Sequence, residues 1–314
     1  MSTARATVKK NLFFSLMLLV VVCSCGRDET PIPVDMSVRT ETTIRQNSGD
    51  ITFAYLPQYS HRTSYQRQNP LVEYLKKETG LSIRQIYPET FDEHVTMFGQ
   101  GKIDISFSNP FIYAKIAHLY GARALARTVE RDGRKDFRGQ IICRRDNQQI
   151  RSIEDCRGKR WIATDPASAG GYLFALGLFY DHGIKRGDFA QIDFAPGSGG
   201  KQEKVVLSVY AGKYDIGSIR EGTLEVVSDR IDIREIRVLA STPWYPGWVY
   251  AVRRDFDPAV AQKVKEALIK LDRNNPEHKK ILDSANISGV VLSDDREFDP
   301  IRKLAAKIGS DLNH

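Results

Sequence analysis

The fold is decided by a stretch of sequence that occurs twice. "FDEHVTMFGQGKIDISFSNP" occupies residues 91–110, and the related "KQEKVVLSVYAGKYDIGSIRE" occupies residues 201–221. Each begins with apolar residues at helical spacing and continues through Gly-Lys-x-Asp-Ile into a short apolar run, which predicts a helix followed by a strand. Gly101 and Gly212 stand where a helix ends in a left-handed conformation. The repetition of helix, glycine, aspartate and strand indicates two lobes of similar structure.

Strand and helix patterns also alternate in the rest of the chain. Strands are predicted at residues 50–57, 81–88, 139–146, 158–166 and 189–197, and helices at residues 69–80 and from Ser168 onward. This alternation predicts an α/β fold in which each lobe has a mainly parallel sheet flanked by helices. The matching residues Asp104 and Asp215 are expected to brace the lobes rather than to catalyse a reaction.

Five segments rich in polar or small residues directly follow predicted strands. They are "LPQYS" at 56–60, "FSNPF" at 107–111, "DPASAGG" at 165–171, "PGSGGKQ" at 196–202 and "SIREG" at 218–222. Ligands of α/β proteins bind beyond the carboxyl ends of the strands. We therefore expect the five segments to surround one cleft.

The segment from Ser168 to Gly171 has two interpretations. Ser168 is a typical N-cap residue, and the glycines let the chain turn. A helix start also carries free N–H groups and partial positive charge, and small residues let an anion approach them. In this second interpretation an oxyanion is held by the Ser168 hydroxyl and by the N–H groups of Ala169 and Gly170. The segment by itself leaves both interpretations open.

Residues 1–24 have the pattern of a secretory signal peptide. A basic segment without acidic residues precedes an apolar run that is too short to span a bilayer, and "CSCG" follows it. This end resembles a bacterial lipobox with Cys25 as the lipidated residue; the alternative is an ordinary cleaved secretion signal. Residues 25–49 are polar and lack an apolar period, so we expect them to tether the fold to the membrane. The predicted location is periplasmic or at the cell surface.

Composition and spacing argue against several classes of function. The formal net charge is +7, and loss of the basic residues Arg5, Lys9 and Lys10 with the signal peptide lowers it to +4. No basic block with interleaved aromatic residues is present, so nucleic-acid binding is not expected. The six histidines do not stand at metal-ligand or catalytic-triad spacing, so we expect no enzyme, metal or cofactor. Cys143 and Cys156 are expected to be buried free thiols; a disulfide is the alternative, because export permits one.

Several segments together resemble the PhnD-like family, the periplasmic phosphonate- and phosphite-binding proteins of ABC importers. The resemblance runs from Asp50 to Pro300 and is carried by "NPLVEYLKKETG", "GKIDISFSNPFIYA", "SIEDCRGKRWIATDPASAGGYL", "KQEKVVLSVYAGKYDIGSIREGTLE" and "YAVRRDFDP". It implies a two-lobed type II periplasmic-binding-protein fold. The expected divisions are 50–140 for lobe 1, 141–242 for lobe 2, and 243–314 for the return to lobe 1 with the C-terminal helices. We expect the hinge at Ile141–Arg145 and Thr242–Val249.

The resemblance also implies ligand-binding residues. In the family the segment that matches Ser168–Gly171 is usually Ser-Thr-Ser-Gly, and it holds the oxyanion with hydroxyl and backbone N–H groups. This chain keeps the Ser168 hydroxyl and has Ala169 and Gly170 at the next two positions. Gln202 stands where the family usually has histidine, and its amide still donates a hydrogen bond. At the strand end that contacts ligand in the first lobe, the matching residues are Ser108 and Asn109.

Arg220 is the candidate that compensates for the lost hydroxyls, because a guanidinium fork binds an oxyanion through two parallel hydrogen bonds. The alternative is an arginine that is solvated or neutralised in a salt bridge, for example with Glu221.

The predicted function is a monomeric, lipid-anchored solute-binding protein that delivers a small oxyanion, namely phosphonate, phosphite or phosphate, to the permease of an ABC importer. The alternative is an oxyanion-sensing lipoprotein that works with a membrane receptor or histidine kinase. That alternative arises because "DIGSIREGTLE", at residues 215–225, resembles a segment of PhnD-like sensor domains.

Overall fold

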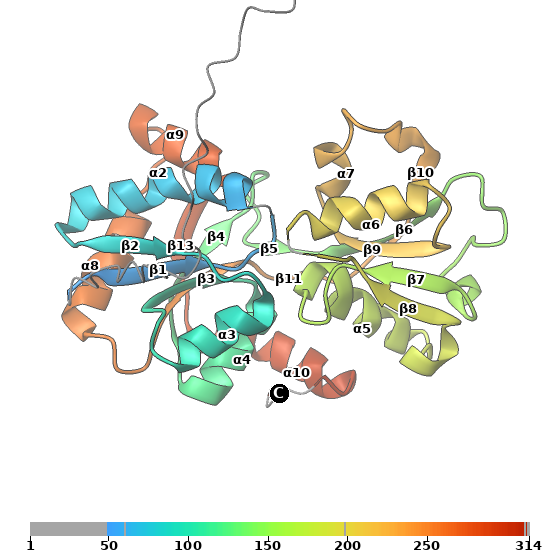
Figure 1. The fold of residues 1–314 in the computed structure, drawn as a ribbon, viewed down its shortest axis with the longest axis horizontal. Coiled ribbons are helices and arrows are strands. Elements are labelled where there is room, and N and C mark those ends of the chain that lie inside the picture. The colour runs from blue at the N-terminus through green and yellow to red at the C-terminus, as the bar shows by residue number, and fades with distance from the viewer. Residues whose placement is uncertain (1–48, 60, 198, 311, 313–314) are drawn as a thin grey trace, which may run out of the picture. The chain divides into compact units, whose positions relative to one another are not determined.

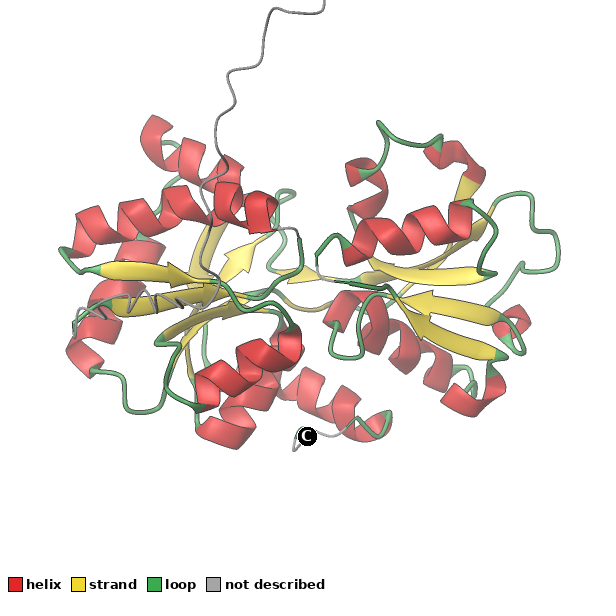
Figure 2. Ribbon diagram, viewed as in Figure 1, coloured by secondary structure: helices red, strands yellow, loops and turns green. Residues whose placement is uncertain are grey.

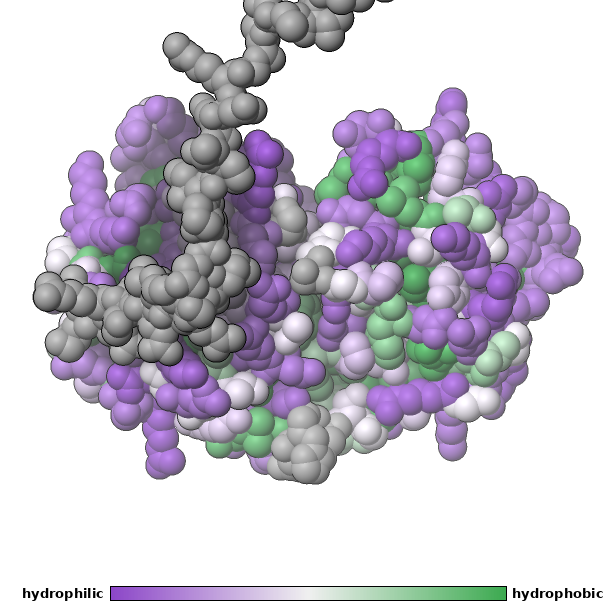
Figure 3. All heavy atoms as spheres, viewed as in Figure 1, coloured by the Kyte–Doolittle hydropathy of each residue, from purple (hydrophilic) through white to green (hydrophobic). Residues whose placement is uncertain are grey.

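The computed structural model describes residues 49–59, 61–197, 199–310 and 312, which form two lobes that each contain one large sheet (Figures 1 and 2). The predicted signal peptide, the predicted lipidation at Cys25 and nearly all of the predicted tether lie outside the described residues. Among the described helices, none has the length and apolar character needed to cross a membrane. In the space-filling view the surface is indented between the two lobes (Figure 3).

The first lobe holds a six-stranded sheet in the order β13-β4-β12-β3-β1-β2. Its strands are β1 (Ile51–Tyr55), β2 (Ile83–Ile86), β3 (Ile105–Ser108), β4 (Arg123–Val129), β12 (Val249–Val252) and β13 (Gly289–Leu292). Its helices are α2 (His61–Thr79), α3 (Phe91–Gly99), α4 (Pro110–Tyr120), α8 (Pro258–Ile269) and α9 (Pro276–Ala285). Helix α2 packs against α8 and α9, whereas α3 packs against α4 (Figure 1).

The second lobe holds a five-stranded sheet in the order β10-β6-β9-β7-β8. Its strands are β6 (Gly139–Arg144), β7 (Arg160–Ala163), β8 (Gln191–Phe194), β9 (Ile216–Arg220) and β10 (Ile236–Ser241). Its helices are α5 (Phe174–Asp181), which continues directly from a π-helical turn at Ala169–Leu173, α6 (Lys201–Tyr210) and α7 (Thr223–Val226). Short 3-10 turns lie at Glu154–Cys156, Arg186–Asp188, Ile233–Glu235 and Asp295–Phe298.

The predicted two-lobed α/β fold is confirmed, but the sheets are mixed rather than mainly parallel. Strand β1 runs parallel to β2 and β3, and β7 runs parallel to β8 and β9. Strand β12 lies between β3 and β4 and is antiparallel to both; β6 lies between β9 and β10 and is antiparallel to both. Strand β13, at the edge of the first sheet, is also antiparallel to β4. Strands β6 and β12 are the ones that the chain forms on its arrival from the other lobe.

The chain crosses between the lobes twice. One crossing lies between the end of β4 at Val129 and the start of β6 at Gly139, and the other lies between β10 and β12. The short strands β5 (Asp136–Phe137) and β11 (Tyr245–Pro246) pair antiparallel within these crossings. The hinge expected at Ile141–Arg145 is therefore misplaced, because Ile141–Arg144 lies inside β6 and Ile141–Cys143 is paired on both sides. The expected segment Thr242–Val249 does contain the second crossing.

The two halves of the sequence repeat occupy equivalent places in the two lobes. Gly101 and Gly212 both end their helices with positive φ, at 71° and 68°, as predicted. Asp104 accepts hydrogen bonds from the N–H of Thr52 at 2.8 Å and from Arg253 Nε at 2.7 Å. Asp215 accepts a hydrogen bond from the N–H at the start of β7, also at 2.8 Å. Each aspartate thus braces the sheet of its own lobe.

The C-terminal segment does not return to the first lobe alone. Helix α10 (Asp299–Lys307) contacts α4 of the first lobe and α5 of the second lobe (Figure 1). Lys307 Nζ donates to the carbonyl of Gly177 at 3.2 Å, and Arg186 donates to Ser310 Oγ at 3.1 Å. Helix α10 and the residues that follow it therefore connect the two lobes by contacts, in addition to the two crossings of the main chain.

Cys143 and Cys156 are free, buried thiols, in agreement with the preferred expectation. Burial raises the pKa of Cys156 to about 12, so its thiol stays protonated and unreactive at neutral pH. Cys156 lies in the 3-10 turn at Glu154–Cys156 rather than in a longer helix.

His94 is the fully buried titratable group of α3. Its Nε2 lies 2.8 Å from Ser106 Oγ, while Nδ1 has no hydrogen-bond partner among the described residues. In the second lobe the matching positions are Val205 and Gly217, where a Cβ on the glycine would lie 2.8 Å from a valine methyl. The polar pair His94–Ser106 in the first lobe and the apolar pair Val205–Gly217 in the second lobe thus occupy equivalent places between a helix and the sheet.

We expect His94 to make the folded protein less stable at mildly acidic pH. Burial lowers the pKa of His94 from 6.5 to about 3, so the folded state keeps it neutral while the unfolded state takes up a proton below pH 6.5. The contribution of His94 to the free energy of unfolding is therefore fully present above pH 6.5. It decreases as the pH falls, and at pH 5.5 it is lower by about 1.5 kcal/mol. Urea unfolding of the wild type and of His94→Gln at pH 8 and pH 5.5 measures this difference.

His118→Gln, at an exposed position of α4, provides the control for the loss of a histidine side chain from the same lobe. An unchanged loss of stability at pH 5.5 in His94→Gln would contradict the assignment to His94.

Candidate functional site

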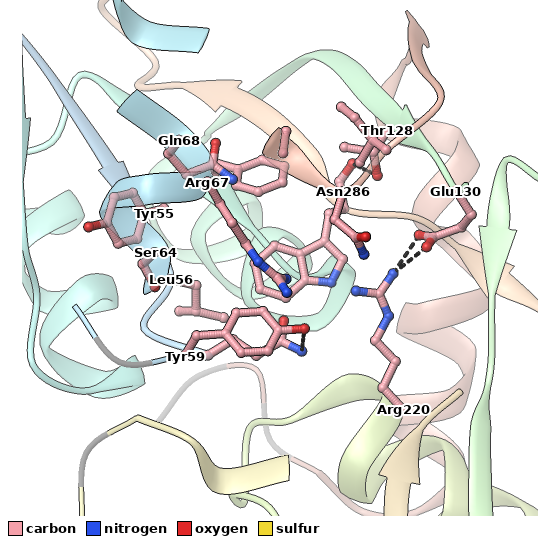
Figure 4. A pocket seen from close by; sticks show the side chains of 15 residues that line it. Tyr55, Leu56, Tyr59, Ser64, Arg67, Gln68, Thr128, Glu130, Arg220 and Asn286 are labelled. Atoms are coloured by element: carbon pink, nitrogen blue, oxygen red, sulfur yellow. Dashed lines mark hydrogen bonds and ion pairs between the residues drawn. The ribbon is translucent and has the colours of Figure 1, made fainter. Parts of the chain in front are cut away.

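Two adjoining cavities lie between the lobes. The first, here called the inner cavity, is lined by residues from all five segments that sequence analysis placed around one cleft: Pro57, Gln58, Phe91, Asn109, Phe137, Thr164, Asp165, Ser168, Ala169, Gly170, Lys201, Gln202, Arg220 and Trp248. The second, here called the α2 cavity, is lined in part by the first turns of α2 (Figure 4). Gln58, Arg220 and Trp248 line both cavities, so the two are contiguous.

The helix that begins after Ser168 combines the two interpretations of its sequence. Ser168 is an N-cap: its Oγ accepts a hydrogen bond from the N–H of Gly171 at 3.2 Å, and its carbonyl accepts from Tyr172 and Leu173. The N–H groups of Ala169 and Gly170 have no acceptor among the described residues, and both residues are buried where they line the inner cavity. Ser168 therefore caps the helix, and the N–H groups of Ala169 and Gly170 remain as donors for a ligand.

Close packing explains the glycines of this segment. A Cβ at Gly171 would lie 2.0 Å from Thr164 Oγ1, and a Cβ at Gly170 would lie 2.9 Å from the ring of Phe137. The main chain can occupy this place only because both residues lack side chains. Thr164 itself lines the inner cavity, and its buried hydroxyl has no hydrogen-bond partner among the described residues. No local sequence pattern marks this hydroxyl, which adds a donor beside that of Ser168.

Two cations reach the inner cavity, and each is paired with a carboxylate. Lys201 begins α6, and its Nζ donates to Asp165 Oδ2 at 2.5 Å. Arg220 ends β9, and its Nη2 lies 2.6 Å from both carboxylate oxygens of Glu130. All four side chains are at least four-fifths buried, so these pairs are screened weakly by solvent.

The Arg220 salt bridge joins residues that are far apart in the sequence. Glu130 follows β4 in the crossing segment, whereas the carboxylate suggested from the sequence, Glu221, binds Arg138 at 2.6–2.8 Å. Only Nη2 of Arg220 contacts Glu130, and the guanidinium also lies 4.8 Å from the ring centre of Phe137. The salt-bridge alternative is thus seen in the structure, and the remaining N–H groups of Arg220 are still available to an anion.

The other predicted residues differ in their relation to the cavity. Gln202 is buried and lines it; its Oε1 accepts from the N–H of Arg220 at 2.9 Å, which leaves its NH2 group for a ligand. Asn109 also lines it, but its Oδ1 caps α4 and its Nδ2 donates to the carbonyl of Ala167 across the cleft at 3.2 Å. Ser108 is fully buried and does not line either cavity; its hydroxyl has no partner among the described residues.

The tryptophans of the second crossing lie at the cleft. Trp248 is 8% exposed, lines both cavities and packs against Phe107 with ring centres 5.2 Å apart. Trp244 is more exposed, and the guanidinium groups of Arg134 and Arg138 lie over its ring at 4.1 and 4.4 Å. Trp248 therefore combines a core position with a cavity wall.

Comparison with protein families identifies the chain over most of its length. Residues 53–298 match the family described as "ABC transporter, phosphonate, periplasmic substrate-binding protein". The chain belongs to this family. Its site therefore lies in a protein that binds a substrate for import, and the two lobes are those of a periplasmic substrate-binding protein.

Individual members of the family are distant relatives. The phosphate-import protein PhnD of Mycolicibacterium smegmatis is 24% identical over 279 residues, which cover 83% of this chain and 86% of that protein. The structure resembles PhnD1 from Prochlorococcus marinus in complex with methylphosphonate, with a TM-score of 0.74, 16% identity, and coverage of 84% of this chain and 99% of that one. It also resembles a phosphonate transporter component from Pseudomonas aeruginosa, with a TM-score of 0.71, 20% identity, and coverage of 82% and 85%.

We expect Glu130→Gln to strengthen oxyanion binding. The substitution removes a negative charge next to the inner cavity and releases Nη2 of Arg220 for the anion. Isothermal calorimetry with inorganic phosphate and methylphosphonate should show an affinity roughly tenfold higher, which corresponds to about 1.4 kcal/mol. Glu221→Gln is the control, because Glu221 contacts Arg138 rather than Arg220. An affinity that falls in Glu130→Gln would show that Glu130 orients Arg220 for the anion instead of competing with it.

Proposed function

We propose that this protein captures a small phosphonate, phosphite or phosphate anion in the inner cavity and delivers it to the membrane permease of an ABC importer. The observation that carries the proposal is the convergence of two kinds of donor in one cavity. The N–H groups of Ala169 and Gly170, which have no acceptor in the described part of the chain, belong to a helix start, where the helix dipole favours an anion. Lys201 and Arg220 supply charge-assisted donors on the same cavity.

The carboxylates in the cavity shape this proposal. In the structure Asp165 and Glu130 neutralise Lys201 and Arg220. An oxyanion that enters the cavity shares these cations with the carboxylates or takes them over. Two charged donors and two backbone donors still match the several acceptor oxygens of a tetrahedral anion, while the paired carboxylates limit the total positive charge.

The sensing alternative has no support comparable to this. The relatives described above are an import protein, a binding protein in complex with methylphosphonate and a transporter component. We therefore propose import as the function.

Lys201→Gln should weaken binding of methylphosphonate by roughly 10- to 100-fold, the range expected for the loss of a charge-assisted hydrogen bond worth about 1.5–3 kcal/mol. Lys204→Gln on the same helix is the matched control, since Lys204 Nζ donates to the carbonyl of Pro196 and does not line the inner cavity. Calorimetry on the purified proteins measures both affinities.

A double variant separates the two ways in which Lys201 could act. If Lys201 contacts the anion, Lys201→Gln with Asp165→Asn stays weaker than the wild type. If Lys201 only neutralises Asp165, the double variant regains wild-type affinity, and that result would refute the direct contact. Failure of the wild type to bind phosphate, phosphite and methylphosphonate alike would refute the proposed function.

We also propose that the exported protein is held at the membrane by lipid on Cys25. The support is the apolar run followed by "VCSCG" at residues 22–26. Acyl chains contribute about 0.8 kcal/mol per buried CH2, and two or more chains give stable anchoring. Cys25→Ser should therefore move the protein from the membrane fraction to the soluble fraction in cell fractionation. Ser24→Ala, which keeps the cysteine, is the control; a variant Cys25→Ser that stays with the membrane contradicts the anchor.

A further inference from the structure

The α2 cavity has its own set of polar groups, apart from those of the inner cavity. Figure 4 shows Arg67 and Asn286 pointing into it, with the Arg220–Glu130 pair at its border. Tyr55 and Gln68 also line it. Because the two cavities share Arg220, a ligand bound in the inner cavity has room to extend a substituent toward Arg67.

Arg67 differs from the other cations of the cleft in having no carboxylate partner. No ion pair of the described residues includes it, whereas Lys201 and Arg220 each have one. Its guanidinium carbon lies 4.1 Å from the ring centre of Tyr59, and the side chain is half-buried. The ring holds the guanidinium in place and leaves its N–H groups without an anionic acceptor.

One buried polar group near Arg67 lacks a hydrogen-bond partner. Gln68 is 6% exposed and lines the α2 cavity, yet its Oε1 has no partner among the described residues. Side-chain amide orientation is assigned from the hydrogen bonds, so Gln68 can present either its oxygen or its NH2 group. Buried polar groups are normally hydrogen-bonded, and this amide is therefore suited to contact a ligand. Tyr55 also lines the cavity, but its hydroxyl points away from Arg67 (Figure 4).

We propose that the α2 cavity binds a carboxylate on the substituent of the ligand, through Arg67 and Gln68. This inference rests on the proposed function, because the phosphonate group of the same ligand occupies the inner cavity. The substrate class is then a phosphonocarboxylate rather than inorganic phosphate. One guanidinium without a carboxylate partner among the described residues, together with an amide, matches the single charge and two oxygens of a carboxylate. A second phosphoryl group would bring two charges to one free cation next to Glu130.

Calorimetry with four phosphonates that differ in the tail tests the proposal. 3-Phosphonopropionate has an anionic tail, butylphosphonate a neutral tail, 3-aminopropylphosphonate a cationic tail and ethylenediphosphonate a second phosphoryl group. We expect 3-phosphonopropionate to bind at least tenfold more tightly than butylphosphonate, with 3-aminopropylphosphonate the weakest. Arg67→Gln should bring the ratio for the first two ligands close to one, and Gln68→Leu should reduce it partly.

Arg62→Gln is the matched control, because Arg62 is exposed on the same helix and does not line the α2 cavity. It should keep the wild-type ratio. Equal binding of the anionic and neutral tails, or a preference that survives Arg67→Gln, overturns the carboxylate site and leaves the proposed function intact. Tightest binding of the amino or diphosphonate ligand also overturns it, in favour of Glu130 or of a phosphoryl group. Failure of all four phosphonates and of methylphosphonate to bind overturns both proposals.

Discussion

The close approach of three main-chain segments around Gly139, Gly170 and Gly171 fixes the centre of the cleft. A Cβ at Gly139 would lie 2.4 Å from the carbonyl oxygen of Gly170, and one at Gly171 would lie 2.0 Å from Thr164 Oγ1. The start of the helix after Ser168 is therefore pressed against the first residue of β6 and the residue that follows β7. This contact holds the N–H groups of Ala169 and Gly170 at the cleft, where side chains at the glycines would have displaced the main chain.

Charge in the cleft is balanced before any ligand binds. Lys201 and Arg220 are partly buried, and isolated buried charges are costly, so each is held by a carboxylate. An anion then gains affinity only if it offers Lys201 and Arg220 better hydrogen-bond geometry than Asp165 and Glu130 do. Because Glu130 belongs to a crossing segment and Arg220 to the second lobe, this balance also couples the charge at the site to the contact between the lobes.

Much of the fold could be predicted from the sequence, because its signals are local. The repeat gave the two lobes, the positive φ of Gly101 and Gly212, and the five segments that line the inner cavity. The antiparallel strands β6 and β12 could not be predicted, since their direction depends on where the chain crosses between lobes.

The candidate site was harder to predict because its partners are distant in sequence. Glu130 is 90 positions from Arg220, and no local pattern connects them. Lys201 lay inside a segment that was expected at the cleft, but its pairing with Asp165 depends on the packing of α6 against β7. Helix α2 begins at His61, whereas the sequence predicted its start at residue 69. The prediction missed the first turns because they bury polar residues such as Ser64 and Gln68 instead of apolar ones. Those polar residues are the ones that line the α2 cavity.

A crystal structure of the protein with bound methylphosphonate tests the anion site most directly. We expect phosphonate oxygens within hydrogen-bond distance of the N–H groups of Ala169 and Gly170 and of Lys201 Nζ. A methylphosphonate located outside the inner cavity, or inside it with these N–H groups bound only to water, would contradict the assignment of the helix start as the anion site.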